Sequence, residues 1–232
     1  MKIVAIVQAR MGSTRLPNKV MKKIGGVLLI ELLLARLSRS NEIHQIVVAT
    51  SKDKKNDPLV EHVKKLGYFC YRGSENNVLQ RYLDAAKKVS ADVVVRVTGD
   101  CPLIDHEIVD QVVSHFRKLE VDYVSNISPP TYPDGLDTEV FTLAALIRAS
   151  EESSSKHEHE HVTPYLRRPG FFETRNVSNS EDFSSLRWTV DEHEDFQVIS
   201  NVFSYFSPDI FFSWRDILDL QKTQPALLTM NK

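Results

Sequence analysis

Short runs of aliphatic and β-branched residues alternate with longer amphipathic stretches through the first half of the chain. Residues 2–8 read KIVAIVQ and residues 92–98 read DVVVRVT, with few polar interruptions. Such runs are typical of β-strands that are covered on both faces of a sheet. The pattern predicts strands at Lys2–Gln8, His44–Thr50, Tyr68–Tyr71 and Asp92–Thr98, and helices at Leu28–Ser38, Asp57–Leu66, Asn77–Val89 and Asp105–Leu119.

The order of these elements predicts the architecture. Strands that alternate with helices at this spacing are joined by right-handed crossovers, which place the strands parallel to one another. We therefore expect an α/β fold with a mostly parallel sheet flanked by helices. Because no Ser- or Gly-rich linker interrupts the sequence, residues 1–232 are predicted to form a single domain.

The pattern becomes less regular after about residue 121. A further strand is predicted at Asp122–Asn126, and a proline-rich turn follows it. Ser155 and Glu158 have the spacing of a capping box, which predicts that a helix begins there. The other elements predicted in this half are helices at Thr142–Glu152 and Glu192–Tyr205 and strands at Phe171–Val177 and Leu186–Val190.

Composition and charge narrow the possible functions. The 232 residues include 29 Lys and Arg against 31 Asp and Glu, a formal net charge of −2. This balance disfavours nucleic-acid and membrane partners, because general binders of either carry an excess of basic residues. No stretch reaches the roughly 18 apolar residues of a membrane span, and the N-terminus reads as a strand rather than a secretion signal. Two cysteines are too few for a disulfide framework, so we expect a cytoplasmic protein.

Basic residues are concentrated directly after the first predicted strand. Arg10, Arg15 and Lys19 fall in this segment together with the small residues Gly12 and Ser13. Ligands of open parallel sheets bind beyond the carboxyl ends of the strands, and an arginine fork matches phosphate oxygens. The segment therefore predicts a polyphosphate-binding loop, although it contains neither a Walker A motif nor the dinucleotide pattern GxGxxG. A solvated basic loop is the alternative interpretation.

Carboxylates follow two other apolar runs. Asp100 comes directly after the predicted strand at residues 92–98, and Asp191 follows the run LRWTV. Mg²⁺ prefers hard oxygen ligands and commonly takes one or two carboxylates plus substrate phosphates. Alternatively, Asp100 is a turn or helix-cap residue and Asp191 is a helix N-cap. Together with the basic loop, the two acids favour chemistry at a nucleoside triphosphate, and without a Walker A loop they favour nucleotidyl transfer.

Five motifs of this chain resemble a known family. It is the cytidylyltransferase-like family of the spore coat polysaccharide biosynthesis protein F type, related to acylneuraminate and 3-deoxy-manno-octulosonate cytidylyltransferases. The resemblance implies a nucleotide-diphospho-sugar transferase (GT-A-like) fold with a Rossmann-like mixed sheet. It also implies Mg²⁺-dependent transfer of CMP from CTP to a sugar or sugar acid, with release of pyrophosphate, for surface polysaccharide biosynthesis. The motifs are QARMGSTRLPNKV, RVTGDCPLID, YPDGLDTEVF, EHVTPYLR and RWTVDEHEDF.

The resemblance also assigns roles to individual residues. Arg10 and Lys19 are implied to act in catalysis together with Asp100 and Asp191, and the two aspartates are implied to hold Mg²⁺. Residues 1–120 would bind the nucleotide, and residues 121–232 would bind the sugar and form a homodimer. The substrate contacts that the resemblance implies are Ala9, Gly12, Ser13, Arg15, Arg72, Ser74, Asn77, Arg81, Asp134, Asp137, Glu139 and His161.

The motifs leave the substrate open. The sugar-acid enzymes usually have a proline–alanine–arginine sequence where this chain has Gln8-Ala9-Arg10, so the sugar and the choice between CTP and UTP do not follow. A glycosyltransferase that uses a nucleotide-sugar donor is one alternative, although it typically carries an Asp-x-Asp motif that this sequence lacks. A non-catalytic nucleotide- or sugar-binding module is another, and replacement of Arg10, Lys19 or Asp100 would have favoured it.

Three histidines, His157, His159 and His161, alternate with glutamates. On a helix, His157 and His161 share a face while His159 points elsewhere, so three convergent zinc ligands would require an extended strand. The predicted capping box favours the helix, and His161 is the histidine that we expect to face the site.

Overall fold

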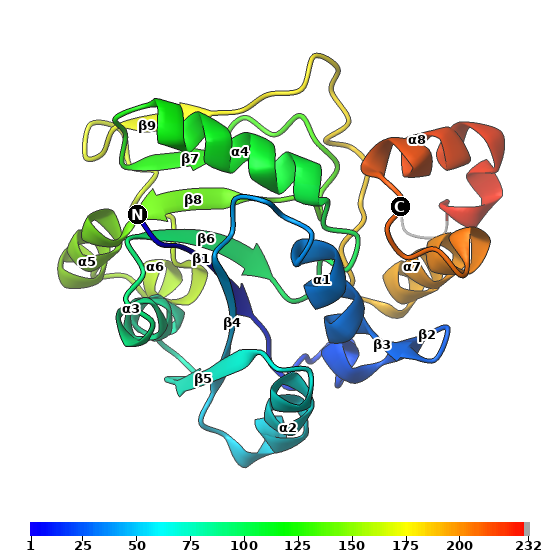
Figure 1. Cartoon of the computed structure of the whole chain (residues 1–232), viewed down its shortest axis with the longest axis horizontal. Helices are drawn as coiled ribbons and strands as arrows, with labels where there is room; N and C mark the ends of the chain where they lie inside the picture. The colour runs from blue at the N-terminus through cyan, green and yellow to red at the C-terminus, as the bar shows by residue number, and fades with distance from the viewer. Residues whose placement is uncertain (230–232) are drawn as a thin grey trace.

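A seven-stranded sheet forms the centre of the molecule (Figure 1). Its strands are β1 (Ile3–Gln8), β4 (Gln45–Ser51), β5 (Phe69–Gly73), β6 (Val93–Thr98), β7 (Tyr123–Ser125), β8 (Glu139–Thr142) and β9 (Thr174–Asn176). In this computed structural model, which describes residues 1–229, the strand order is β5-β4-β1-β6-β8-β7-β9. The first four strands of that order are parallel, β8 is antiparallel to both neighbours, and β9 is parallel to β7. The predicted mostly parallel sheet is confirmed.

Helices cover both faces of the sheet (Figure 1). One face packs against α1 (Leu29–Leu37), α2 (Asp57–Lys65) and α4 (His106–Lys118), and the other packs against α3 (Val78–Lys88), α5 (Leu143–Glu152) and α6 (Lys156–His161). Helices α7 (His193–Phe206) and α8 (Trp214–Thr223) lie beside each other at one end of the sheet.

Strand β1 shows why its sequence is almost continuously apolar. It lies between β4 and β6, and Ile3–Val7 are at most 1% exposed. Alternate side chains enter different cores: Ala5 and Val7 belong to the cluster that contains α1 and α4, whereas Val4 and Ile6 belong to the cluster that contains α3 and α5. Burial on both faces therefore explains the absence of alternating polar residues.

The structure confirms the strands and helices that the first half of the sequence predicts, with ends that shift by at most two residues. In the second half, the strand predicted at Phe171–Val177 is reduced to β9. A hairpin of β2 (Lys23–Ile24) and β3 (Val27–Leu28), the strand β8 and the helix α8 have no counterpart among the predicted elements.

The strand predicted at Leu186–Val190 is wrong. This segment lies outside the sheet and makes an isolated bridge between Arg187 and Asp134. Its backbone bonds to turn residues instead of to a strand: Trp188 N–H donates to the Asp134 carbonyl at 2.7 Å, and Val190 N–H donates to the Asp100 carbonyl at 2.8 Å. The apolar pattern reflects burial of Trp188 and Val190 in the core rather than sheet pairing.

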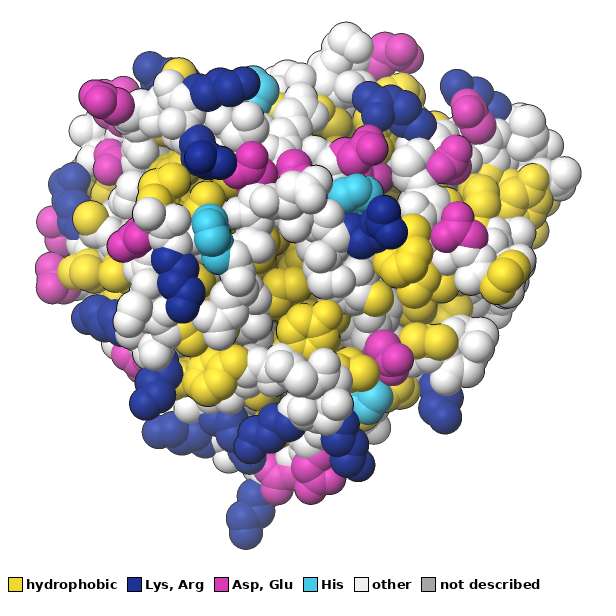
Figure 2. Space-filling view, viewed as in Figure 1, with side chains coloured by type: hydrophobic (Ala, Val, Ile, Leu, Met, Phe, Trp, Pro, Cys, Tyr) yellow, Lys and Arg dark blue, Asp and Glu magenta, His cyan; other side chains and the backbone are white. Residues whose placement is uncertain are grey.

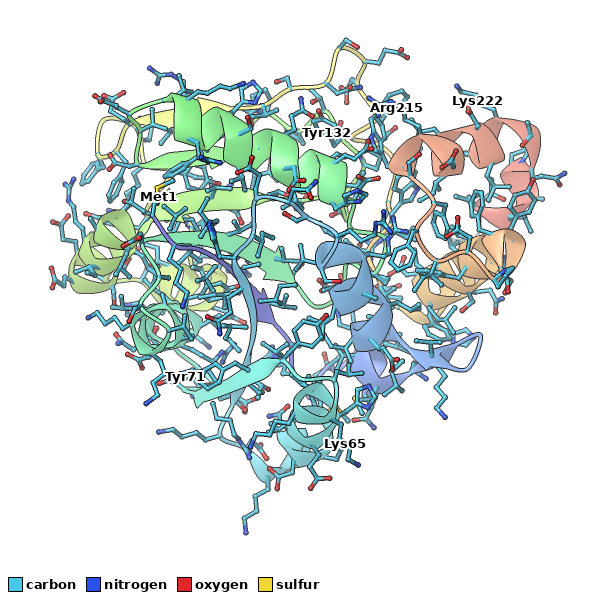
Figure 3. All side chains as sticks on the ribbon, in the orientation of Figure 1. Met1, Lys65, Tyr71, Tyr132, Arg215 and Lys222 are labelled. Carbon is cyan, nitrogen blue, oxygen red and sulfur yellow. The ribbon has the colours of Figure 1, made fainter. Side chains whose placement is uncertain are left out.

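Asp105 joins α8 to α4. Its carboxylate, in a residue that is 2% exposed, accepts a hydrogen bond from Trp214 N–H at 2.8 Å and caps α4 through Glu107 N–H at 2.9 Å. The Trp214 ring packs edge-on against Tyr132, with 5.5 Å between ring centroids. Figure 3 labels Arg215 at the start of α8 and Tyr132 above α4.

The surface carries charges of both signs. Figure 2 shows lysine and arginine interspersed with aspartate and glutamate over one face of the molecule, as the near-neutral composition implies. No helix among residues 1–229 combines the length and apolar character needed to cross a bilayer.

Candidate active site

A cavity of about 420 Å³ opens at the carboxyl ends of β1 and β6. It is formed by the loop after β1, the turn after β6, and residues of α3 and α6. The structure therefore brings the basic loop and both predicted acids, Asp100 and Asp191, to one cavity, although they are far apart in the sequence. The predicted site residues that line it are Ala9, Arg10, Gly12, Ser13, Arg15, Lys19, Arg81, Asp100, His161 and Asp191.

The two strand ends approach each other at Gly99. Its N–H donates to the Gln8 carbonyl at 2.8 Å. A Cβ at this position would lie 2.8 Å from the same carbonyl oxygen and 2.9 Å from the Ala9 Cβ, too close for either to accommodate. Glycine is therefore required here, and it places Asp100 beside the loop that carries the cations.

Lys19 lies between the two predicted acids. Its Nζ is 2.9 Å from Asp100 Oδ2, 2.9 Å from Asp191 Oδ1 and 2.8 Å from the Val190 carbonyl oxygen. Burial of the ammonium opposes its charge, but the two carboxylates outweigh that effect, so the pKa of Lys19 is raised. Burial likewise opposes the charge of Asp100, and Lys19 outweighs it, so the pKa of Asp100 is lowered. The three side chains form one charged hydrogen-bonded group at the cavity wall.

The turn at Gly135 helps to place Asp191 next to Asp100. The φ angle of Gly135 is +113°, and a Cβ there would lie 2.8 Å from the Trp188 carbonyl carbon and oxygen. Only a glycine allows the backbone around Trp188 to approach the turn in this way. Val190, bonded to the Asp100 carbonyl, then delivers Asp191 to the cavity.

The N-terminus of α7 fixes the backbone of Asp191. The carboxylate of Asp195 accepts hydrogen bonds from Asp191 N–H at 2.8 Å and Glu192 N–H at 2.9 Å, and it pairs with Arg187. Arg15 reaches the same place, with its Nη2 at 2.9 Å from Asp191 Oδ2. The N-cap of α7 is Glu192, so the alternative interpretation of Asp191 as an N-cap is wrong.

Of the two alternatives for Asp100, the helix cap is wrong, because the N-cap of α4 is Asp105, and the turn is confirmed. Asp100 follows β6 in a turn closed by a hydrogen bond from Cys101 N–H to the Thr98 carbonyl at 3.2 Å. Its side chain points to Lys19.

Three of the predicted substrate contacts lie outside the cavity and have local structural partners. Arg72 donates to backbone carbonyls of residues 51–53 in the loop after β4. Asn77 caps α3, with its Oδ1 accepting from Gln80 N–H at 2.9 Å. Ser74 accepts from Asn77 N–H at 3.0 Å, so it supports the same cap.

Arg81 is a predicted contact that does face the cavity. It is 2% exposed, its Nη1 donates to the Ser74 carbonyl, and its Nε has no hydrogen-bond partner among residues 1–229. Burial lowers its pKa. A buried guanidinium with an unused donor at a cavity wall is suited to binding a polar ligand.

Asp134, Asp137 and Glu139 also lie outside this cavity, in and after the turn before β8. Glu139 is 1% exposed and is occupied by an ion pair with Arg96 and a 2.6 Å hydrogen bond from Tyr123. Burial, reinforced by Asp134 and Glu139, raises the pKa of Asp137 to about 7. Arg96 lines the cavity but is absent from the predicted set; a basic residue inside the apolar run VVVRVT was the signal for it.

The histidine segment forms the helix that its capping box predicts. Ser155 and Glu158 exchange both hydrogen bonds of the box at the start of α6. The rings of His157 and His161 lie 4.5 Å apart, and His159 turns away to the Ser153 carbonyl. His161 lines the cavity as expected, and burial lowers its pKa. Within residues 1–229, no three His, Cys, Asp or Glu side chains gather around one point that could hold a metal ion.

The chain is a nucleotidyltransferase, and its cavity combines the cation-rich loop after β1 with the carboxylates of Asp100 and Asp191. The chain belongs to the cytidylyltransferase family, whose sequence model matches residues 4–216. It is 33% identical to the spore coat polysaccharide biosynthesis protein SpsF of Bacillus subtilis over 237 residues, which cover 98% of this chain and 97% of that protein. The resemblance expected from the motifs is confirmed.

Solved structures agree with this assignment. A cytidylyltransferase from Leptospira borgpetersenii superposes with a TM-score of 0.96 at 36% identity, covering 100% of this chain and 98% of that one. A CMP:2-keto-3-deoxy-manno-octonic acid synthetase superposes with a TM-score of 0.70 at 18% identity, covering 88% of this chain and 99% of that one. The second likeness extends the shared fold to more distant enzymes.

Proposed function

We propose that this protein is a Mg²⁺-dependent cytidylyltransferase that transfers CMP from CTP to a hydroxyl group of a sugar or sugar acid and releases pyrophosphate. The observation that carries the proposal is the position of Lys19, whose ammonium lies 2.9 Å from both Asp100 and Asp191 at the wall of the cavity. The family supports transfer of a cytidylyl group. The relative SpsF, named for spore coat polysaccharide biosynthesis, supports a surface polysaccharide as the end product.

CTP is supported as the nucleotide by the likeness to a synthetase solved with CTP. In the structure, Lys19 and Arg15 pair with carboxylates, and Arg10 lies 3.7 Å from Glu75. We infer that the triphosphate exchanges these partners for phosphate oxygens, which arginine and lysine bind through charge-assisted hydrogen bonds. Gly12 and Ser13 lie in the same loop and leave room for its backbone N–H groups to approach a phosphate.

The carboxylates fit the ion that the family implies. Asp100 Oδ2, Asp191 Oδ1 and the Val190 carbonyl oxygen all lie within 2.9 Å of one point, the Lys19 nitrogen, so hard oxygen atoms converge there. Mg²⁺ is held in this way by one or two carboxylates together with substrate phosphates. We propose that Asp100 and Asp191 hold it, and that it neutralises charge on the phosphate oxygens.

The reaction follows from this arrangement. The sugar hydroxyl oxygen attacks the α-phosphorus in line with the bridging oxygen, the bond from phosphorus to that oxygen breaks, and pyrophosphate departs while the hydroxyl proton passes to solvent. The negative charge that develops on the oxygen atoms of the departing pyrophosphate is stabilised by Arg10, Arg15 and Lys19. Positioning and electrostatic stabilisation supply most of the rate enhancement in such a site.

We place the acceptor on the side of the cavity formed by the second half of the chain. His161 lines the cavity there, and the turn that carries Asp134 and Asp137 adjoins Asp191 through the Trp188 backbone. The charges of Asp100 and Asp191 act on Asp134, so this turn lies near the proposed metal ligands, which suits recognition of a sugar that must meet the α-phosphate.

We also propose that the protein is a homodimer formed through its second half. Tyr205 and Phe211 are 53% and 43% exposed beside the stacked rings of Phe206 and Phe212. A mass measurement by light scattering at micromolar concentration tests this, and a monomeric mass would refute it.

A pyrophosphate-release screen tests the catalytic proposal. Each of the four ribonucleoside triphosphates is incubated with Mg²⁺ and a panel of sugar acids and sugar phosphates, with Asp100→Asn as the matched inactive control. We expect release with CTP and one class of acceptor, and little with the variant. Hydrolysis of a nucleotide sugar without pyrophosphate release from any triphosphate would instead support a glycosyltransferase.

A further inference from the structure

The loop after β1 is organised around the backbone of Met11. The Met11 carbonyl oxygen accepts hydrogen bonds from Ser13 N–H at 3.0 Å and from Asn18 N–H at 3.2 Å, so it joins both arms of the loop. Asn18 adopts a left-handed conformation, with φ 57°, directly before the short 3-10 turn that begins with Lys19. The position of Lys19 therefore depends on where Met11 is held.

Asn56 holds Met11 from the other side. Its Oδ1 accepts a hydrogen bond from Met11 N–H at 2.8 Å, and its Nδ2 donates to Ser51 Oγ at 2.7 Å and to the Asp53 carbonyl at 3.3 Å. The residue is fully buried in the 3-10 turn that follows β4. Because both ends of the buried amide are bonded, its orientation is defined, and the oxygen must face the loop.

A second connection reaches the same loop through Ser51. The Ser51 hydroxyl donates to Glu75 Oε2 at 2.8 Å, and Glu75 Oε1 lies 3.7 Å from Arg10 Nη1. Arg10 directly precedes Met11, so it is restrained through its backbone by Asn56 and through its side chain by Glu75. Both restraints meet at the Ser51 hydroxyl.

We propose that Asn56 is a positioning residue for the triphosphate-binding loop. This inference rests on the proposed function of that loop. Asn56 lies behind the loop and acts by keeping Arg10 and Lys19 in one arrangement before the nucleotide arrives. A loop that spends about a tenth of its time in the competent arrangement binds about 10-fold more weakly, because apparent affinity scales with the competent fraction.

Two substitutions separate positioning from general stability. Asn56→Ala removes all three side-chain hydrogen bonds, whereas Asn56→Asp keeps an oxygen that can accept from Met11 N–H. Asp105→Ala is the matched control, because Asp105 is also buried and also fixes a distant backbone N–H at 2.8 Å, but at α8 rather than at the loop. Each protein is assayed by calorimetric titration with inorganic triphosphate and with CTP plus Mg²⁺, by amide hydrogen exchange, and by thermal unfolding.

We expect Asn56→Ala to weaken binding of both ligands about 10-fold and to speed exchange of the Met11, Ser13 and Asn18 amides. Asn56→Asp keeps the acceptor for Met11 N–H but loses the bonds that Nδ2 donates, so it should weaken binding less than Asn56→Ala does. Asp105→Ala should lower Tm and leave both dissociation constants unchanged. If Asn56→Ala does not fold, Ser51→Ala supplies the comparison, since it removes the partner of the Asn56 amide and the contact with Glu75.

The outcomes are distinguishable. Unchanged triphosphate affinity in folded Asn56→Ala overturns the positioning role and leaves the proposed function intact, as does an equal loss of affinity in Asp105→Ala. A wild-type protein that binds neither inorganic triphosphate nor CTP overturns the proposed function, and the positioning role with it.

Discussion

Replacing Lys19 by methionine removes the ammonium from the centre of the site while keeping most of the side-chain volume. The carboxylate oxygens of Asp100 and Asp191, each 2.9 Å from that nitrogen, then face each other without it. At a separation of about 5 Å and an effective dielectric constant of about 20, two unit charges repel by about 3 kcal/mol. We therefore expect the pKa of Asp100 to rise in the variant, because Lys19 is the group that lowers it.

The same substitution removes one cation from the proposed triphosphate site. Loss of a single group that stabilises transition-state charge costs on the order of 10²–10³ in kcat, or about 3–4 kcal/mol. The assay is steady-state pyrophosphate release with CTP and a saturating acceptor, with circular dichroism to confirm folding. Lys19→Arg is the charge-conserving control and should retain part of the activity. A folded Lys19→Met protein with near-normal kcat/KM would refute the reasoning.

Three further predictions concern the same site. Asp100→Ala should cost about 3 kcal/mol or more in transition-state stabilisation, measured as Mg²⁺-dependent pyrophosphate release; near-normal turnover would contradict a ligand role. The pairing of Lys19 with Asp100 should stabilise the fold between about pH 5 and pH 9, because its contribution is lost as pH falls through the lowered pKa of Asp100 or rises through the raised pKa of Lys19. Denaturant titrations should show a difference in the free energy of unfolding between wild type and Lys19→Met that is constant within this pH range and becomes smaller below and above it. A difference that is largest at the extremes of pH would contradict the prediction. Gly135→Ala should destabilise the protein by about 1–3 kcal/mol, since its φ is +113° and a Cβ would meet the Trp188 backbone at 2.8 Å; an unchanged Tm would count against that.

The sequence predicts the first half of the fold well for a physical reason. Strands β1 and β6 are parallel and covered on both faces, so nearly all of their residues are apolar and the runs stand out from the amphipathic helices. Helix α6 could be predicted equally well from the sequence, because its capping box is a local signal that depends on Ser155 and Glu158 alone.

The misassigned elements depend on contacts that are distant in sequence. Strand β8 was not predicted, because it contains Glu139, and the local sequence pattern places a charged residue at the surface or in a functional site rather than in a buried strand. In the sheet, Glu139 lies directly opposite Arg96 of β6 and forms an ion pair with it. The strand prediction at Leu186–Val190 was wrong for the opposite reason. The apolar residues of this segment are buried, but its backbone forms hydrogen bonds with turns rather than with a strand. Residue type and spacing do not distinguish these cases from an ordinary strand.

The sequence predicts the part of the site that lies at the ends of strands. Asp100 and the basic loop follow neighbouring parallel strands, so topology alone brings them together. Arg72, Ser74 and Asn77 were assigned because they fall where enzymes of the family contact the nucleotide or sugar, and their side chains bond to the loop after β4 and to the cap of α3 instead of lining the cavity. The bridging position of Lys19 depends on which loop side chain reaches between the acids, and this follows from the Met11 and Asn18 backbone geometry rather than from spacing.

On the proposed function, the paired charges of the site would link nucleotide binding to binding of the metal ion. Lys19 and Arg15 form ion pairs with Asp100 and Asp191. When a triphosphate binds, each cation exchanges a carboxylate for a phosphate, so the binding free energy contains only the difference between the two interactions. Withdrawing Lys19 also leaves two carboxylates facing each other, at the cost of about 3 kcal/mol derived from their separation. A divalent cation held by the same two carboxylates removes that repulsion and adds charge for the phosphates. If the proposed function holds, we therefore expect the nucleotide to bind more tightly together with its metal ion than either does alone, which titrations with and without Mg²⁺ would show.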